Sequence, residues 1–172
     1  IRMENRLLEV KNLKVSFKVG KKKLTAVEDI EFSLDKGKII GIVGESGCGK
    51  SVTATSILRL ASPAVSEIDE NSQILFDGED LTKVSEARMR QIRGNEISMI
   101  FQEPMSSLNP VYRIENQMLE MIRTHNKKIS KKEALGQCIE MLKRVGIPSP
   151  EQRVKEFPHQ LSGGMRQRVM IA

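Results

Sequence analysis

The stretch GESGCGKS, from Gly44 to Ser51, decides how the rest of the sequence is interpreted. Its spacing is typical of a phosphate-binding loop, in which glycines let successive backbone N–H groups point inward at an anion. The apolar run KIIGIVG (38–44) leads into it, and a helical pattern from Lys50 to about Leu60 follows. This order predicts that the loop binds phosphate in front of the positive end of a helix dipole.

The loop pattern assigns separate roles to its last side chains. Lys50 brings a positive charge to the outer phosphates, and Ser51 offers its hydroxyl to Mg²⁺. Cys48 is interpreted as a small filler that a bound nucleotide would shield from alkylation. The predicted nucleotide contacts here are Gly44, Glu45, Ser46, Gly47, Cys48, Gly49, Lys50, Ser51 and Val52.

The sequence before the loop predicts antiparallel β-structure. Residues 7–34 alternate in part between apolar and polar side chains, with Ile30, Phe32 and Leu34 expected to point inward. Residues 35–37 read as a turn. A further short strand is expected in 72–78, where it leads into an Asp-Gly turn.

Two runs are interpreted as strands that are buried on both faces, the first because it is nearly all apolar. They are KIIGIVG (38–44) and EISMIFQ (96–102). Between them, Ser85 to Arg93 predicts a polar helix. We therefore expect 38–44 and 96–102 to lie in a central sheet.

The sequence becomes helical after residue 102. A loop with two prolines is expected in 103–113, followed by helices at 114–125 and 130–145. The second helix begins with a capping box, Ser130 with Glu133 three residues on. Its predicted apolar stripe consists of Leu135, Ile139, Leu142 and Val145, and Gly146 and Pro148 end it.

Composition excludes several classes of protein. The chain has 172 residues and a net charge of +6, but its lysine clusters at 18–23 and 126–132 are not interleaved with aromatic residues. We therefore expect no nucleic acid as a direct ligand. No apolar run approaches the roughly 20 residues of a membrane span, and the charged first residues do not suggest a signal peptide. Cys48 and Cys138 suggest neither a disulfide framework nor a metal site.

The last residues, LSGGMRQRVMIA (161–172), again place a serine and two glycines before a helix. Alone, this pattern would be an ordinary serine cap with flexible glycines. A helix start with free amides is also a second anion site. The two nearby histidines, His125 and His159, are interpreted as structural or surface residues rather than catalytic ones.

In this order, GESGCGKS, FQE (101–103) and LSGGM (161–165) resemble the Walker A loop, Q-loop and signature motif of the ABC ATPase family. The resemblance implies an α/β fold, a P-loop NTPase core with an N-terminal antiparallel β subdomain and an inserted helical subdomain. It implies a core in 1–102, the helical subdomain in 103–160, and the signature with the start of its helix in 161–172.

The same resemblance implies roles for further residues. Phe17 stands where the family stacks an aromatic ring on adenine, and Gln102 where it reaches Mg²⁺ and the attacking water. Lys50 and Gln102 are thus the expected catalytic residues, with ATP and Mg²⁺ as ligands. The signature residues expected to meet the ATP of a partner subunit are Leu161, Ser162, Gly163, Gly164 and Met165.

Three longer stretches, GIVGESGCGKS, IFQEPMSSLNP and FPHQLSGGMRQRVMIA, resemble the ATPase subunits of dipeptide and oligopeptide importers. The implied partners are a second ABC ATPase subunit, transmembrane permease subunits and, indirectly, a substrate-binding protein. The implied location is peripheral, at the cytoplasmic face of the cell membrane. Nickel importers remain an alternative. So does a soluble ABC ATPase acting on nucleic acid or the ribosome, against which the short 103–160 insert without sustained heptads argues.

In the family, an apolar strand ending in Asp-Glu, the Walker B strand, follows soon after the signature. It would complete the central sheet and supply a Mg²⁺ ligand and the residue that polarises water. The resemblance therefore implies the N-terminal part of a longer ATPase, with an incomplete central sheet. We expect this chain to bind nucleotide weakly and not to turn over, because a positioned base contributes about 10²–10⁴ in rate. A non-catalytic binding domain remains a third interpretation.

Overall fold

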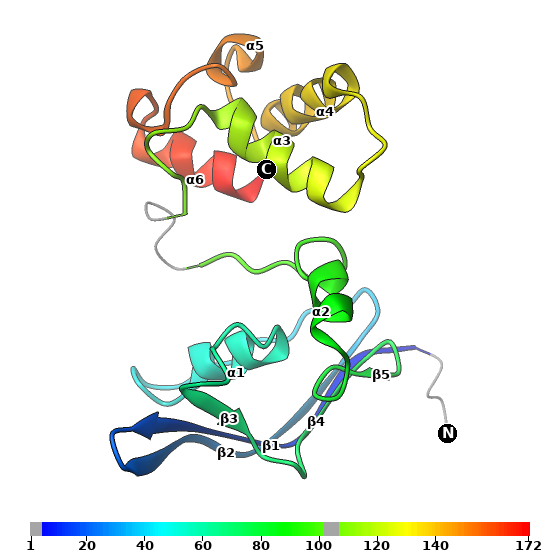
Figure 1. The fold of residues 1–172 in the computed structure, drawn as a ribbon, viewed down its shortest axis with the longest axis vertical. Helices are drawn as coiled ribbons and strands as arrows, with labels where there is room; N and C mark the ends of the chain where they lie inside the picture. Colours follow the sequence, from blue (N-terminus) through cyan, green and yellow to red (C-terminus); the bar gives the residue numbers. More distant parts are fainter. Residues whose placement is uncertain (1–4, 102–106) are drawn as a thin grey trace. The chain divides into compact units, whose positions relative to one another are not determined.

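The computed structural model describes residues 5–101 and 107–172. The chain divides between Arg93 and Gly94 into two compact units. The first unit combines a β-sheet with two short helices, and the second is helical (Figure 1). No helix within the described ranges is both long enough and apolar enough to cross a membrane.

The sheet of the first unit is antiparallel throughout. A long hairpin is formed by β1 (Arg6–Val19) and β2 (Lys22–Asp35). The short strand β3 (Ser66–Ile68) pairs with the end of β1, and β4 (Gln73–Phe76) with its beginning. With β5 (Glu79–Asp80) beside β4, the order is β2-β1-β4-β5. The expected N-terminal antiparallel β-structure is confirmed.

Three turns connect its strands and lead out of them, and those after Asp35 and at Asp77–Gly78 lie where the sequence predicted them. Gly20 has φ 62 at the tip of the β1–β2 hairpin, within the first lysine cluster. Lys38 N–H donates to Asp35 O (3.1 Å) to close the next turn. Asp77 and Gly78, with φ 46 and 87, form the turn between β4 and β5. Left-handed backbone at both centres of a two-residue turn matches the twist of the paired strands.

Two helices follow the predicted ranges in this unit. They are α1 (Lys50–Ile57), which packs on β1 and β2, and α2 (Glu86–Ile92), which Ser85 caps. The helix α1 ends before Leu60 because Arg59 takes φ 49. Apolar side chains from the sheet and from both helices form the buried core, namely Val10, Leu13, Val15, Val27, Leu58, Ile74, Leu81, Met89 and Ile92.

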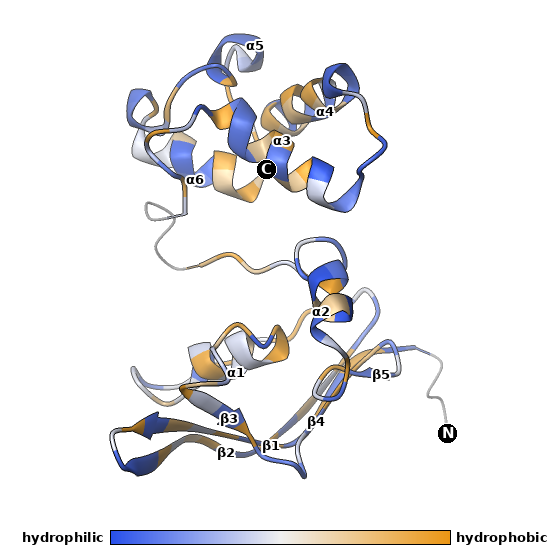
Figure 2. Cartoon of the chain, in the orientation of Figure 1, coloured by the Kyte–Doolittle hydropathy of each residue, from blue (hydrophilic) through white to orange (hydrophobic). Residues whose placement is uncertain are grey.

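The two apolar runs expected as buried strands are not strands. Residues 38–44 are coil, with Ile39 98% and Val43 93% exposed. Residues 98–101 are also coil, drawn in the apolar colour in Figure 2, and Ile100 is 60% exposed. A strand needs a hydrogen-bonded neighbour, and no strand of the described sheet pairs with either run. Ile97 makes only an isolated bridge beside Gly94, whose N–H donates to Ile97 O (2.9 Å). The central sheet therefore remains incomplete, as the resemblance implied.

A local correction concerns β2. Ile30 is exposed rather than inward, whereas Phe32 and Leu34 are half-buried as expected. Asp29 has φ 53, and the β1–β2 register shifts on both sides of the Leu13–Ile30 pair. Each such shift breaks the alternation of faces on which the prediction for Ile30 depended.

The second unit is a helical cluster. Its elements are α3 (Ile114–His125), α4 (Lys131–Arg144), α5 (Pro150–Arg153), a 3-10 turn η2 (Pro158–Gln160) and α6 (Gly163–Ile171). The buried core draws on all the α-helices or the residues next to them, namely Ile114, Leu119, Ala134, Cys138, Leu142, Ile147, Val154, Leu161 and Val169. The predicted limits of α3 and α4 are confirmed.

The capping box of α4 is also confirmed. Ser130 Oγ accepts from Glu133 N (3.2 Å), and Ser130 N–H donates to Glu133 Oε2 (3.1 Å). The hydrogen bond from the Ser130 hydroxyl lowers the pKa of Glu133. Of the predicted apolar stripe, Leu142 is fully buried, and its other members are partly buried against the core. The predicted stripe omitted Ala134 and Cys138, which are as fully buried as Leu142.

The exposed run 38–43 predicts self-association of the chain, because unpaired apolar backbone recruits further strands. Replacing Ile39 and Val43 with lysine should reduce the mass found by light scattering toward that of a monomer. Val111→Lys is the matched control, since it changes an equally apolar exposed side chain in the second unit. A wild-type chain that stays monomeric across a concentration series would contradict the prediction.

Candidate functional site

The predicted phosphate loop has the backbone of an anion cradle. Gly47 and Gly49 take φ 82 and 95, which other residues rarely adopt. A Cβ on Gly49 would lie 2.9 Å from Ala26 O and 3.1 Å from Val27 Cγ2, both on β2. Gly49 is thus required both by its conformation and by the close approach of the sheet.

The start of α1 offers unpaired backbone donors. Gly49 occupies the N-cap position, and no side chain caps the helix. Thr53 N–H donates to Gly49 O (2.8 Å). Within the described residues, however, the N–H groups of Lys50, Ser51 and Val52 have no hydrogen-bond partner. These donors and the helix dipole favour an anion at this point.

Lys50 is folded back onto the loop. Its Nζ donates to Gly44 O (2.7 Å) and Glu45 O (2.6 Å) and lies 3.5 Å from Cys48 Sγ. The ammonium therefore already sits over the loop, where it satisfies two carbonyls. A phosphate reaching the loop would exchange these contacts with neutral carbonyls for contacts in which the acceptor is charged as well as the donor.

Phe17 lies on β1, the strand next to the one that supports the loop. It is half-buried, opposite Leu24 of β2 and Ser66 of β3. Val27 of β2, which Gly49 approaches, pairs with Val15, two residues or about 7 Å back along β1 from Phe17. The ring and the support of the loop therefore belong to neighbouring strands. Gln102 lies outside the described residues.

The LSGG stretch forms a second helix start. Ser162 is the N-cap of α6, and its Oγ accepts from Met165 N (3.3 Å). Gly163 and Gly164 are exposed, and their N–H groups have no partner in the described part of the chain. The Leu161 side chain is buried in the helical core, so it anchors the turn. Backbone donors of the two glycines thus face solvent on a fixed base.

Sequence reasoning missed the contacts that hold this turn. Arg168 Nη1 donates to Gly146 O (2.8 Å) at the end of α4, and its Nε to Gly164 O (3.4 Å). His159, interpreted as a structural or surface residue, is exposed and stacks on Phe157 with ring centroids 5.6 Å apart. The sequence contains no periodic signal for either contact.

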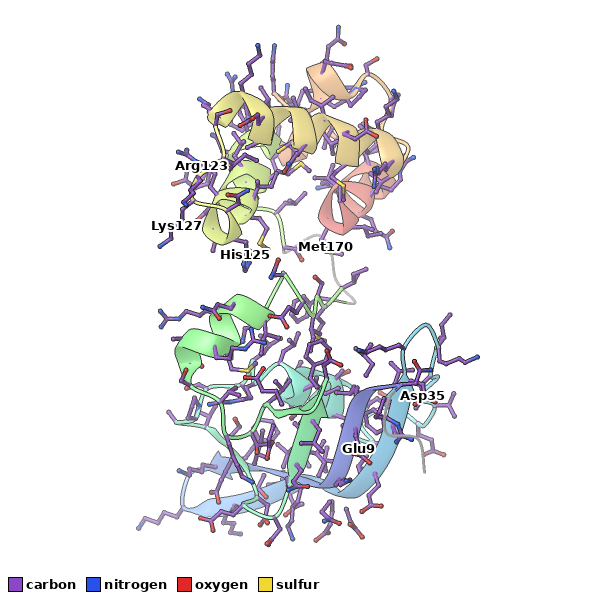
Figure 3. All side chains as sticks on the ribbon, turned by 90° about the vertical axis from the view of Figure 1, so that its right-hand side faces the viewer. Glu9, Asp35, Arg123, His125, Lys127 and Met170 are labelled. Carbon is purple, nitrogen blue, oxygen red and sulfur yellow. The ribbon has the colours of Figure 1, made fainter. Side chains whose placement is uncertain are left out.

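Three further kinds of group could carry chemistry: basic side chains of the helical unit, the two cysteines, and clusters of metal-ligating residues. Arg123 and Lys127 belong to the end of α3 and the turn after it, at the periphery of the helical unit (Figure 3). The structure pairs neither Cys48, which is exposed, nor Cys138, whose pKa burial raises to about 11. Among the residues described, no three His, Cys, Asp or Glu side chains gather as metal ligands.

Comparison with known proteins places the chain in a family. The model of the ABC transporter family matches residues 27–172. The chain belongs to the ABC transporter family. The matched range includes the phosphate loop and the LSGG turn.

Curated members of the ABC transporter family resemble the chain closely. The oligopeptide transport ATP-binding protein OppD of Bacillus subtilis is 50% identical over 97% of this chain and 46% of its own length. The dipeptide transport ATP-binding protein DppD of the same organism is 48% identical over 97% of this chain and 49% of its own length. The chain thus spans about half the length of these relatives.

Solved structures establish the ABC cassette fold. A dimeric bacterial ABC transporter cassette, MJ0796, matches 96% of this chain and 67% of its own, with a TM-score of 0.79 and 24% identity. A structure of the same cassette in a post-hydrolysis state, bound to ADP and Pi, matches equally well. The fold predicted from the three motifs is confirmed.

The contact between Gly49 and β2 predicts a difference between two glycines. Gly49→Ala should lower the free energy of unfolding by about 2–3 kcal/mol, from backbone strain and the close approach to Ala26 O. Gly47→Ala, where nothing lies within 4 Å, should cost only the strain, about 1 kcal/mol. Urea titrations of both variants make the test, and equal losses would show that the packing contact is unimportant.

Proposed function

We propose that the chain is the ATP-binding part of an ATPase subunit that powers import of di- or oligopeptides. The observation that carries the proposal is the start of α1, where Lys50 lies over the loop and the N–H groups of 50–52 have no partner in the described part of the chain. The relatives named for oligopeptide and dipeptide transport, at 50% and 48% identity, support the substrate class.

ATP would lie along the first unit. We assign its outer phosphates to the amides of 47–52 and to Lys50. On binding, the Lys50 ammonium would give up its hydrogen bonds to Gly44 O and Glu45 O. We assign the adenine to the face of Phe17, a half-buried residue that pairs with Leu24 of β2 and Ser66 of β3. The other contacts in the proposed site are Gly44, Glu45, Ser46 and Cys48.

The residues also suit Mg²⁺. Ser51 is exposed at the first turn of α1, beside Lys50, and its hydroxyl is the kind of oxygen donor that Mg²⁺ prefers along with phosphates and water. When bound, Mg²⁺ neutralises charge on the β- and γ-phosphates. We propose Gln102 as the second protein contact, positioning the attacking water, and Lys50 as the catalytic cation.

The signature turn would act on a second subunit. Gly163 and Gly164 present amides at the start of α6, which we propose meet the γ-phosphate of ATP bound to a partner ATPase. Ser162 and Met165 form the rest of that contact, and Leu161 anchors it. In this arrangement two ATP molecules hold two subunits together, and hydrolysis lets them separate.

Docking to transmembrane permease subunits would use the loop within 103–113. Its described part, 107–113, exposes Val111 (71%) and Tyr112 (54%), apolar side chains suited to a protein partner. We propose that the subunit lies at the cytoplasmic face of the membrane, with a substrate-binding protein acting indirectly. The functional parts would then be 1–102, 103–160 and 161–172.

MgATP titrated into the chain by calorimetry should give saturable binding that Lys50→Ala abolishes. The reason is that the variant removes the only side-chain cation over the loop in the described unit. Lys143→Ala, which removes an exposed positive charge on α4, is the matched control and should bind as the wild type does. Binding that survives Lys50→Ala would sink the proposed site.

Alkylation of Cys48 should be slowed by MgATP, because its Sγ lies 3.5 Å from the ammonium that moves onto phosphate. Mass spectrometry after a timed pulse of reagent measures this. The buried Cys138 serves as an internal control, since its labelling reports unfolding rather than nucleotide. Equal labelling of Cys48 with and without MgATP would count against nucleotide in this loop.

A further inference from the structure

The exposed loop 107–113 is fastened to α3. Gln117, one turn into the helix, donates through Nε2 to Asn109 O (3.0 Å) and Tyr112 O (3.0 Å). Its Oε1 accepts from Asn109 N (2.8 Å). A single side chain thus holds both ends of the 109–112 turn, and the exposed Val111 and Tyr112 move with α3 rather than independently.

The first turn of α3 is fastened in turn to a distant segment. Arg113, its N-cap residue, makes no side-chain cap. Instead, Ile114 N–H donates to Glu156 O (2.9 Å) and Glu115 N–H to Val154 O (2.7 Å). Two helix-start donors that would otherwise be orphaned therefore bind backbone 40 residues further along the chain, just before the LSGG turn.

Phe157 closes the same junction with its side chain. The Arg113 guanidinium lies over one part of the ring, 5.7 Å from its centroid. The His159 ring stacks at 5.6 Å with only 12° between the planes. Cation–π and aromatic pairs of this kind are individually weak, so they bias one arrangement without locking it.

The segment between Phe157 and the signature turn is short and hydrogen-bonded. Phe157 N–H donates to Gln160 Oε1 (2.8 Å), and η2 leads directly to Leu161, which is buried, and to the Ser162 cap. A displacement of the Phe157 ring is therefore passed to the Ser162 turn through a segment whose backbone is tied at both ends.

We propose that Phe157 is a positioning residue that couples the loop 107–113 to the signature turn. A partner pressing on Val111 and Tyr112 shifts Arg113, and the Phe157 ring transmits that shift to Ser162. One part of this proposal rests on the proposed function: that docking at the loop sets how Gly163 and Gly164 meet a neighbouring nucleotide. The coupling itself is a property of the helical unit.

The test is a double-variant cycle on the complete chain without nucleotide, read by amide exchange in NMR spectra. The reporter is Met165 N–H, which bonds to Ser162 Oγ. Arg113→Ala and Phe157→Leu should each speed its exchange by about three- to tenfold, and the double variant should exchange at the single-variant rate within a factor of about two. Phe157→Tyr, which keeps the ring, should restore the wild-type rate.

Two controls separate coupling from simple destabilisation. Arg123→Ala replaces an exposed arginine at the other end of α3, and with Phe157→Leu it should show no interaction. The Leu142 amide in the core should keep its exchange rate in every variant. A Met165 rate that Arg113→Ala leaves unchanged, fully additive effects, or equal acceleration at Leu142 would each overturn the proposal. Because no ATP is used, a failed nucleotide titration would not affect the exchange result. A failed exchange test would likewise leave the proposed nucleotide site untouched.

Discussion

The approach of Gly49 to β2 is the constraint on which the nucleotide unit depends. The loop backbone at Gly49 lies so near β2 that an added Cβ would be only 2.9 Å from Ala26 O. The start of α1 therefore cannot shift without losing its support from the sheet. That fixed start determines where the free amides of 50–52 point and where Lys50 can reach. The antiparallel sheet is therefore part of the phosphate site, since its second strand sets the height of the loop.

Both helical starts expose amides, but they achieve it differently. At α1 a glycine in the left-handed region replaces a side-chain cap, which leaves the donors for a ligand. At α6 the Ser162 hydroxyl caps Met165 and leaves the amides of Gly163 and Gly164 open to solvent. Each start also has a cationic side chain bonded to nearby carbonyls: Lys50 to Gly44 O and Glu45 O at α1, and Arg168 to Gly164 O and Gly146 O at α6.

Local signals in the sequence predicted the local structure well. The Ser130–Glu133 box, the Asp77–Gly78 turn and the limits of α3 each depend on residues a few positions apart, and each was confirmed. The prediction of buried strands at 38–44 and 96–102 was wrong. Apolar composition indicates burial in a sheet only if a partner strand is present. The Phe17 and signature assignments depend on a resemblance, and the chemistry of their residues supports them without testing them.

The contacts that the sequence could not reveal are those between segments far apart, and in the helical unit they share a pattern. Gln117, Arg113, Phe157 and Arg168 each join a loop to a helix end rather than a helix to a helix. Core packing of Leu142 and its neighbours would hold the helices together without them. Because these ties use partly exposed polar and aromatic groups, each contributes little to stability and much to orientation. A unit built this way keeps its core rigid while the geometry of its loops can be reset by modest forces, which is what a docking surface coupled to a nucleotide-facing turn requires.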